Sequence, residues 1–354
     1  MAALSLFSKK STPVWGVDIG ASAVKVLALE GSAAKPQLRA FGSAPLAKGD
    51  ASGGVISRNE AVANALEAAI ASAGVKIKHA AVAMPSQAVT MRTLSYPAGL
   101  SERDLEQFVE TDASNQLPFP LDEVRLDFCK TGNLLPNEEE EVLLVATKRD
   151  VSDTRLMVLE HAGLNPKVLD IESLAVQRTI TSLAVKLPKA GRGLLVAHLD
   201  LGAELLKLTV VRDKEVLFER EQAVGGYRLS QDIAKKFSLT LDEAERKKRV
   251  SDLPPEYAQG LLKPFLSTAG ESAARLLQQF YTSTPFSRVD HIYLAGGCAL
   301  LPGITETMIQ FTDSTVELAK IGSALGGSSA KLRQFERESV IYSVAYGLAL
   351  RAFS

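Results

Sequence analysis

The sequence predicts a duplicated two-lobe α/β fold, and three observations support this prediction. The chain has 354 residues, enough for two lobes that each close a hydrophobic core of their own. Strand patterns and helix patterns alternate along it. Residues 17–27 and 199–209 resemble each other, with aspartate, glycine, alanine and lysine at matching places. The repeat therefore predicts one lobe from each half of the chain.

Both copies of the repeat predict the same order of elements. A strand ends in Asp-x-Gly, a tight turn follows, and two more strands come next, at residues 24–30 and 36–44 or at 205–212 and 215–223. In the first half a helix at 58–73 stops at Gly74, and a strand follows at 79–84. In the second half, helices at 227–237, 241–250 and 264–282 precede a strand at 291–295. A mobile loop at 322–330 and a helix at 340–352 are expected last.

Residues 86 to about 160 interrupt the repeat and are interpreted as an insertion. They predict a strand at 88–96, a helix at 102–116, strands at 123–130 and 141–147, and a helix from Ser152. The acidic run 138–141 is interpreted as a solvated hairpin tip. The predicted organisation is an N-terminal arm (1–12), a first lobe (13–86), the inserted subdomain (87–160), the first lobe continued with a connecting helix (161–191), a second lobe (192–337) and a helix returning to the first lobe (338–354).

Composition excludes several classes of function. Lys and Arg number 40 against 41 Asp and Glu, so the chain has no field that would attract nucleic acid. No apolar run approaches the roughly 20 residues of a membrane span, and the N-terminus lacks a signal core. The two cysteines, Cys129 and Cys298, fit a reducing compartment. The four scattered histidines disfavour a zinc site and are interpreted as ordinary residues at strand margins.

The two Asp-x-Gly turns predict a site for a triphosphate and its metal. Such a turn aims backbone N–H groups at one point, and glycine lets anionic oxygens approach. Aspartates assist when Mg²⁺ lies between them and the phosphates, usually through water. We therefore expect ATP with Mg²⁺ in a cleft between the lobes, with Asp18 and Asp200 facing the metal and Lys25 returning over the phosphates. The predicted phosphate-site residues are Asp18, Gly20, Ala21, Ser22, Lys25, Asp200, Gly202, Ala203 and Glu204.

Three further segments complete the candidate site. Gly225 and Gly226 open a helix whose N–H groups favour an anion. An ordinary turn where the chain leaves the hairpin is an equally good interpretation of the two glycines. The basic helix at 245–249 is, on its own, best interpreted as a solvated face. Residues 291–303 run from a buried strand through Gly296 and Gly297 to Leu300, an arrangement that lets backbone approach a flat ligand such as a purine.

These elements, in this order, resemble the actin, hexokinase and DnaK-type chaperone superfamily. The resemblance implies an actin-like (ribonuclease H-like) fold and covers nearly the whole chain. Glu245, Lys248 and Arg249 resemble the chaperone Glu-x-x-Lys-Arg that flanks the adenosine. Residues 162–165 followed by Glu172 resemble the chaperones' first connecting segment, which implies that Glu172 lies near the metal and the attacking water, as a candidate catalytic residue.

Within the superfamily, the chain resembles the PilM family of FtsA-like proteins of type IV pilus assembly. The inserted strand-helix-strand-strand order lies where FtsA carries its relocated subdomain, and residues 6–10 and 346–351 are similar to PilM. The resemblance implies a cytoplasmic, ATP-binding adaptor held at the inner membrane by the N-terminal peptide of PilN, in a groove between the first lobe and the insert. The PilO-PilN platform and pilus motor ATPases are further expected partners. The sequence leaves open whether the chain forms a homo-oligomer.

One departure from the superfamily bears on catalysis. Glu204 and Leu205 stand in the second loop where relatives tend to have small or uncharged polar residues. A carboxylate there would repel the γ-phosphate unless it turns away, so slow or absent hydrolysis is expected. The alternatives are an FtsA-like polymerising cell-division actin and a small-molecule kinase of the same superfamily. FtsA usually ends in an amphipathic membrane helix, and a kinase needs a carboxylate base beside its substrate, for which the sequence offers only Glu172.

Overall fold

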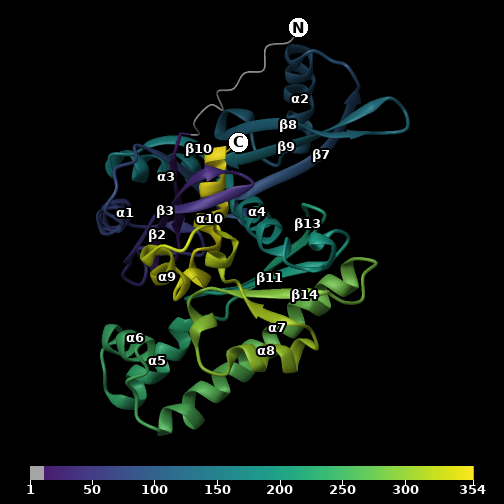
Figure 1. Ribbon diagram of the computed structural model, residues 1–354. Coiled ribbons are helices and arrows are strands. Elements are labelled where there is room, and N and C mark those ends of the chain that lie inside the picture. Colours follow the sequence, from purple (N-terminus) through teal and green to yellow (C-terminus); the bar gives the residue numbers. More distant parts are fainter. Residues whose placement is uncertain (1–11, 354) are drawn as a thin grey trace.

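The computed structural model describes residues 12–353 (Figure 1). The predicted N-terminal arm, including residues 6–10, lies outside this range apart from Thr12. Two five-stranded sheets form the framework of two lobes, and a three-stranded sheet belongs to the insertion. The fold is therefore the expected α/β arrangement, with mixed sheets and helices packed against their faces.

The two large sheets have the same strand order, which confirms the duplication. The order is β10-β6-β1-β2-β3 in the first sheet and β15-β14-β11-β12-β13 in the second. In each, the first three consecutive strands pair antiparallel and the other two join in parallel. The strands of the first sheet are β1 (Val14–Ile19), β2 (Ala23–Ser32), β3 (Lys35–Pro45), β6 (His79–Met84) and β10 (Asn165–Ile171). Those of the second are β11 (Val196–Leu201), β12 (Leu206–Arg212), β13 (Glu215–Gln222), β14 (His291–Ala295) and β15 (Val316–Leu318).

Helices cover both faces of the first sheet. One face packs against α1 (Asn59–Ala73) and α3 (Arg149–His161), and the other against α10 (Ser343–Ala349) and α4 (Glu172–Ala184). Helix α1 ends where the sequence predicts, because Gly74 adopts the left-handed conformation with φ of 70°. In Figure 1 the yellow α10 passes through the middle of the molecule, beside α4.

Close backbone contacts hold α10 in this central position. A Cβ at Gly16 of β1 would lie 2.0 Å from Ala345 O, and one at Gly347 would lie 1.9 Å from Ala175 O of α4. Glycine is required at both places because any side chain would collide with backbone. A shared apolar cluster around α10 and α4 includes Val14 from the first lobe and Tyr293 from the second. These two helices therefore join the lobes.

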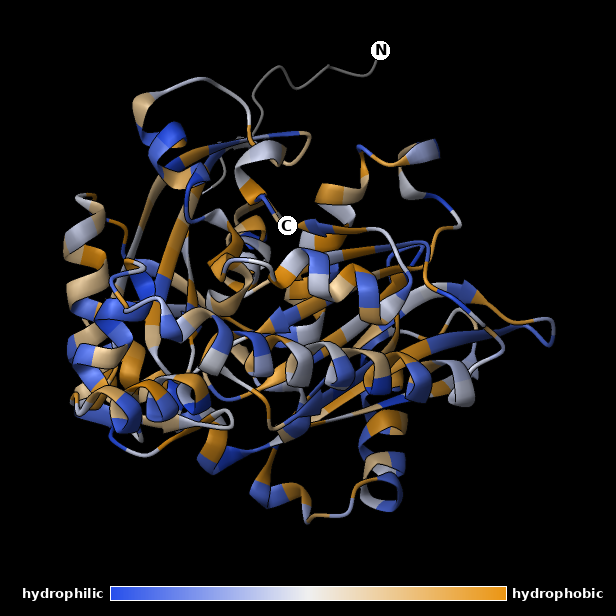
Figure 2. Ribbon diagram, turned by 90° about the horizontal axis from the view of Figure 1, so that it is seen from below, coloured by the Kyte–Doolittle hydropathy of each residue, from blue (hydrophilic) through white to orange (hydrophobic). Residues whose placement is uncertain are grey.

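The second lobe packs α7 (Lys263–Ser283) and α8 (Ile304–Thr312) against the second sheet. Helices α5 (Gly226–Phe237) and α6 (Leu241–Arg249) pack on each other beside it. Helix α6 begins with a capping box, in which Thr240 and Glu243 bond each other's backbone N–H. Figure 2 shows polar and apolar residues alternating along the helices. This alternation is expected for helices that bury one side against a sheet.

The insertion has the predicted strand-helix-strand-strand order. It consists of β7 (Val89–Pro97), α2 (Glu102–Gln116), β8 (Val124–Leu134) and β9 (Glu139–Lys148), with β9 between the other two strands. Ser101 caps α2 by accepting a hydrogen bond from Asp104 N at 3.2 Å. An apolar cluster that includes Val109 and Leu144 fills the space between α2 and the sheet. The insertion therefore has a small core of its own.

Several predictions of local structure were wrong. The predicted loop at 322–330 contains a 3-10 segment, Ile321–Ala324, and Gly326 N donates to Pro36 O at 2.8 Å, so this segment is fastened to β3. The predicted final helix is split, with α9 (Ala330–Glu336) before it and 3-10 turns on either side of α10. Of the acidic run, only Glu138 occupies a turn, and the other three glutamates belong to β9. His198 lies buried inside β11 rather than at a strand margin.

Candidate functional site

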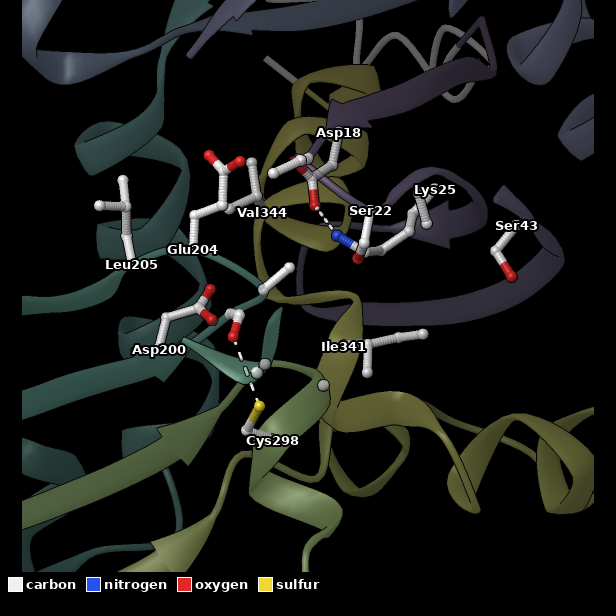
Figure 3. A pocket seen from close by; sticks show the side chains of 18 of the residues that line it. Asp18, Ser22, Lys25, Ser43, Asp200, Glu204, Leu205, Cys298, Ile341 and Val344 are labelled. Atoms are coloured by element: carbon white, nitrogen blue, oxygen red, sulfur yellow. Dashed lines mark hydrogen bonds and ion pairs between the residues drawn. The ribbon is translucent and has the colours of Figure 1, made fainter. Parts of the chain in front are cut away.

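The two Asp-x-Gly turns have the same geometry and face one cavity. Gly20 N donates to Ala23 O at 3.1 Å, and Gly202 N donates to Leu205 O at 2.9 Å. Each turn is the tip of an antiparallel hairpin, so its outward N–H groups converge on the space between the lobes. Figure 3 shows Asp18 and Ser22 above this space and Asp200 below it. The predicted pair of turns is therefore brought together.

The cavity between the lobes measures about 420 Å³, and nearly all predicted site residues line it. The predicted residues along its wall are Asp18, Gly20, Ala21, Ser22, Lys25, Glu172, Asp200, Gly202, Ala203, Glu204, Gly226, Glu245, Lys248, Arg249, Gly296, Gly297 and Leu300. Gly225 is the exception, since it packs behind the second turn, where a Cβ would lie 2.4 Å from Ala203 O. Its absent side chain lets α5 begin against that turn.

Lysines balance the acidic groups at the phosphate end of the cavity. Lys25 Nζ lies 2.7 Å from Asp18 Oδ2, so Lys25 pairs with the aspartate of its own hairpin (Figure 3). Burial alone would lower the pKa of Lys25, but the charge of Asp18 raises it above its ordinary value. Burial raises the pKa of Asp200, against the lowering effect of Lys25 and Lys207. Removing Asp200 from water is therefore costly unless a cation joins it.

Glu172 is held by a lysine that the sequence did not single out. Lys207 Nζ lies 2.7 Å from Glu172 Oε1 and 2.9 Å from Glu172 Oε2. Glu172 is the first residue of α4, and Lys207 lies on β12 in register with Asp200. Lys207 occupies the position in the second copy of the repeat that Lys25 occupies in the first. This equivalence was the signal that could have identified Lys207.

Hydrogen bonds from the first lobe hold the carboxylate of Glu204. Its Oε2 accepts hydrogen bonds from Ser52 Oγ at 2.8 Å and from Gly53 N at 3.1 Å, both in the first lobe. These residues belong to the cleft hairpin, residues 51–56, formed by β4 (Ala51–Ser52) and β5 (Val55–Ile56). The hairpin, which the sequence analysis missed, lines the cavity through its two central glycines.

The first lobe anchors the cleft hairpin from behind. Gly53 O accepts from Gln87 Nε2, and Gly54 O accepts from Arg155 Nη2. Arg155 is buried and also donates to Ala83 O at 3.0 Å. Burial lowers the pKa of Arg155 to about 10, against the raising effect of Glu172. Since Arg155 lies on α3 and Gln87 just before β7, the hairpin is tied to both ends of the insertion.

The other end of the cavity carries the basic helix and the Gly-Gly turn. Lys248 Nζ donates to Glu245 Oε1 at 2.8 Å and to Gly226 O at 3.1 Å, so α6 is fixed against the start of α5. Gly296 has φ of 88°, and a Cβ there would lie 2.3 Å from Asp200 Oδ1. A Cβ at Gly297 would meet nothing within 4 Å. This end therefore offers bare backbone beside charged groups, which suits a flat polar ring.

Both aspartates predicted to face a metal line the cavity, from opposite lobes. Within residues 12–353, no group of three or more His, Cys, Asp or Glu side chains gathers to hold a metal alone. Two carboxylates with water and phosphate oxygens are a usual setting for Mg²⁺, which keeps several waters. The residues therefore fit Mg²⁺ brought by a nucleotide better than a metal bound by protein alone.

Comparison with known proteins decides the family. Residues 16–353 match the family described as type IV pilus assembly protein PilM. The chain belongs to the PilM family. It superposes with a TM-score of 0.75 and 27% identity on a solved PilM-PilN type IV pilus biogenesis complex, covering 96% of this chain and 98% of that one. The PilM family, and with it the duplicated actin-like fold and a place in type IV pilus assembly, is thereby shown.

Two curated relatives are more distant. The cell division protein FtsA of Streptococcus pneumoniae is 23% identical over 338 residues, 82% of this chain and 72% of FtsA. The ethanolamine utilization protein EutJ of Escherichia coli is 25% identical over 149 residues. That match covers 42% of this chain, and the chain spans 46% of EutJ. Across residues 12–353, every helix is too short or too polar to cross a bilayer.

Proposed function

We propose that this PilM-family chain binds ATP with Mg²⁺ in the cavity between its lobes and serves as a nucleotide-dependent adaptor in type IV pilus assembly. The observation that supports this proposal best is the pair of equivalent turns, at Gly20 and Gly202, lining one cavity of about 420 Å³. Two duplicated N–H cradles on opposite lobes suit a triphosphate gripped from both sides. The family supplies the cellular setting.

The charges of the cavity fit this ligand. Lys25, Lys207 and Lys248 line the wall from the phosphate end to the opposite end, where Arg249 joins them. Bound Mg²⁺ would neutralise phosphate charge and approach Asp18 and Asp200 through water. The open backbone at Gly297 would accommodate the adenine.

Binding alone can set the shape of the chain. A ligand at 100 times its dissociation constant adds about 2.7 kcal/mol to the state that binds it. Because the cavity walls come from both lobes, that energy favours the closed arrangement of the lobes. A partner that recognises this arrangement would then be recruited only when nucleotide is bound, without any need for turnover.

The partner we propose is the N-terminal cytoplasmic peptide of PilN. The solved relative with 27% identity is a PilM-PilN complex, and nearly the whole of that chain is covered by this one. We propose that the peptide occupies a groove between the first lobe and the insertion and holds the chain at the cytoplasmic face of the inner membrane. Contacts with PilO and with pilus motor ATPases are proposed through this assembly.

Asp200→Ala tests the proposal. Calorimetry should show ATP affinity reduced at least tenfold, and binding of a synthetic PilN peptide in the presence of ATP should weaken with it. Asp232→Ala is the matched control, because Asp232 on α5 is 44% exposed, is not part of the cavity wall and pairs with Arg228 at 3.3 Å. Unchanged ATP affinity together with undiminished peptide binding in Asp200→Ala would count against the proposal.

A further inference from the structure

Two equivalent lysines in the duplicated hairpins have different partners. Lys25 is in register with Asp18, and Lys207 is in register with Asp200, at the same place in each repeat. Lys25 bonds its own aspartate at 2.7 Å. Lys207 instead reaches out of its hairpin and bonds both oxygens of Glu172. The duplication is therefore broken at this point.

The Lys207–Glu172 pair is sheltered. The two side chains are 25% and 18% exposed, and both line the cavity. Burial alone would lower the pKa of Lys207, but Glu172, aided by Asp200 and Glu221, raises it well above its ordinary value. The lysine therefore stays charged across the physiological range, and the pair is a stable feature of the cavity.

Hydrolysis of ATP in this cavity would need a group that accepts a proton from water. The water oxygen forms a bond to the γ-phosphorus, the bond from that phosphorus to the β–γ bridging oxygen breaks, and the electron pair of that bond stays with ADP. The proton released by the water must pass to a base within hydrogen-bond reach. Glu172, a carboxylate that lines the cavity together with both turns, is the candidate for this role.

Lys207 restrains the carboxylate of Glu172. Both oxygens of Glu172 accept from the ammonium, which occupies one acceptor site on each oxygen and turns the carboxylate toward Lys207. We propose that Lys207 is a positioning residue that holds Glu172 in an ion pair, so that bound ATP is retained rather than hydrolysed. This inference rests on the proposed ATP binding. It explains why a PilM-family chain would respond to bound ATP without hydrolysing it.

Lys207→Ala, compared with the wild-type chain, tests the inference. With saturating MgATP, phosphate release should rise roughly ten- to hundredfold, within the range that a positioned general base supplies. Calorimetry, run separately, sets the saturating concentration for each variant, because Lys207 also lines the ligand cavity. Lys207→Arg keeps the charge and should keep the low rate. Lys235→Ala is the matched control, since Lys235 is an exposed lysine on α5 away from the cavity.

A second pair of measurements separates catalysis from structure. Adding Glu172→Gln to Lys207→Ala should abolish the gain in phosphate release. Without nucleotide, the melting temperatures of the two single variants and the double variant should be non-additive, because removing either partner breaks the same pair. Lys207→Met, which keeps most of the length of the side chain but cannot donate to Glu172, replaces Lys207→Ala if the alanine variant does not fold.

The outcomes distinguish this inference from the proposed function. Bound ATP with no rise in phosphate release in Lys207→Ala or Lys207→Met would overturn the role of Lys207 alone. A rise that survives Glu172→Gln would do the same. Failure of the wild-type chain to bind ATP in the calorimeter would overturn both proposals at once.

Discussion

Glu204 Oε2, in the second phosphate turn, accepts a hydrogen bond from Gly53 N of the cleft hairpin at 3.1 Å. The two residues belong to opposite lobes, and both line the cavity, so their bond joins the lobes at the cavity wall. Tyr227 Oη of α5 makes a second crossing by donating to Ala21 O at 3.1 Å. Nucleotide exchange requires the lobes to part, so these contacts should resist it.

Glu204→Ala should speed release of nucleotide about fivefold. The variant loses a net hydrogen-bond contribution of about 1 kcal/mol, and 1.4 kcal/mol corresponds to a factor of ten. Stopped-flow measurement of a fluorescent ATP analogue leaving the protein gives the rate, with Glu204→Gln, which keeps an acceptor, as the intermediate control. Slower release would mean that repulsion between the carboxylate and the phosphates outweighs the bridge.

Gly297→Val should weaken ATP binding at least tenfold and leave the nucleotide-free melting temperature nearly unchanged. A Cβ at Gly297 meets nothing within 4 Å, so the β-carbon that valine adds projects into open space, where it would meet a ligand. Gly347→Ala provides the contrast, because its Cβ would lie 1.9 Å from Ala175 O and should prevent stable folding. Calorimetry and thermal melting measure the two effects. An ATP affinity of Gly297→Val equal to that of the wild-type chain would contradict the placement of the adenine at this turn.

Asp170→Ala should destabilise the chain by about 3 kcal/mol. Asp170, whose side chain is 6% exposed, bonds Arg178 and lies 3.5 Å from Arg351 Nε, so its removal leaves two arginines uncompensated. The figure is at the lower end for a broken buried pair because both arginines stay partly exposed. Asp153→Ala, which removes a 46% exposed partner of Arg125, should cost less than about 1 kcal/mol. Similar denaturant midpoints for the two variants would contradict this assignment.

Stability should fall as the pH drops from about 6.5 to about 4. Burial lowers the pKa of His198 to about 4, against a weaker raising effect of Glu172. Below the ordinary histidine pKa, the unfolded chain binds a proton that the folded chain excludes. The free energy of unfolding therefore falls by up to about 3 kcal/mol across this window. Above pH 6.5 this contribution is fully present and constant.

His198→Leu should flatten that part of the pH profile, measured by denaturant unfolding at a series of pH values. His161→Leu is the control, because His161 is exposed and its removal should leave the slope unchanged. An unaltered slope in His198→Leu would assign the acid sensitivity to other groups.

The fold was predictable because the repeated Asp-x-Gly motif identifies equivalent strands in the two halves of the chain. Asp18 and Asp200 mark the ends of equivalent strands, and the structure gives both sheets the same order. Helix α2 was predicted to the residue, since Ser101 caps its start and Pro118 follows its end. Strands β10 and β15 were missed because they lie at sheet edges and are fixed by pairing with β6 and β14 rather than by a pattern of their own.

The candidate site was predictable where backbone geometry defines it. Turns that contain glycine can be recognised from the sequence, and Gly20, Gly202 and Gly297 all line the cavity. The partners of side chains were not predictable. The cleft hairpin contacts Gln87, Arg155 and Glu204 through tertiary contacts that no sequence pattern indicates. Lys207 could have paired with Asp200 as readily as with Glu172.

The position of α10 has a consequence for synthesis. Strand β1 is translated long before α10, yet Gly16 packs against Ala345 and Ala349 of that helix. Until α10 has been made, part of one apolar face of the first sheet stays uncovered, and such exposed surfaces invite aggregation. The first lobe therefore stays incomplete until α10 is translated, which makes the nascent chain a natural client for chaperones and predicts that chains terminated before α10 are insoluble.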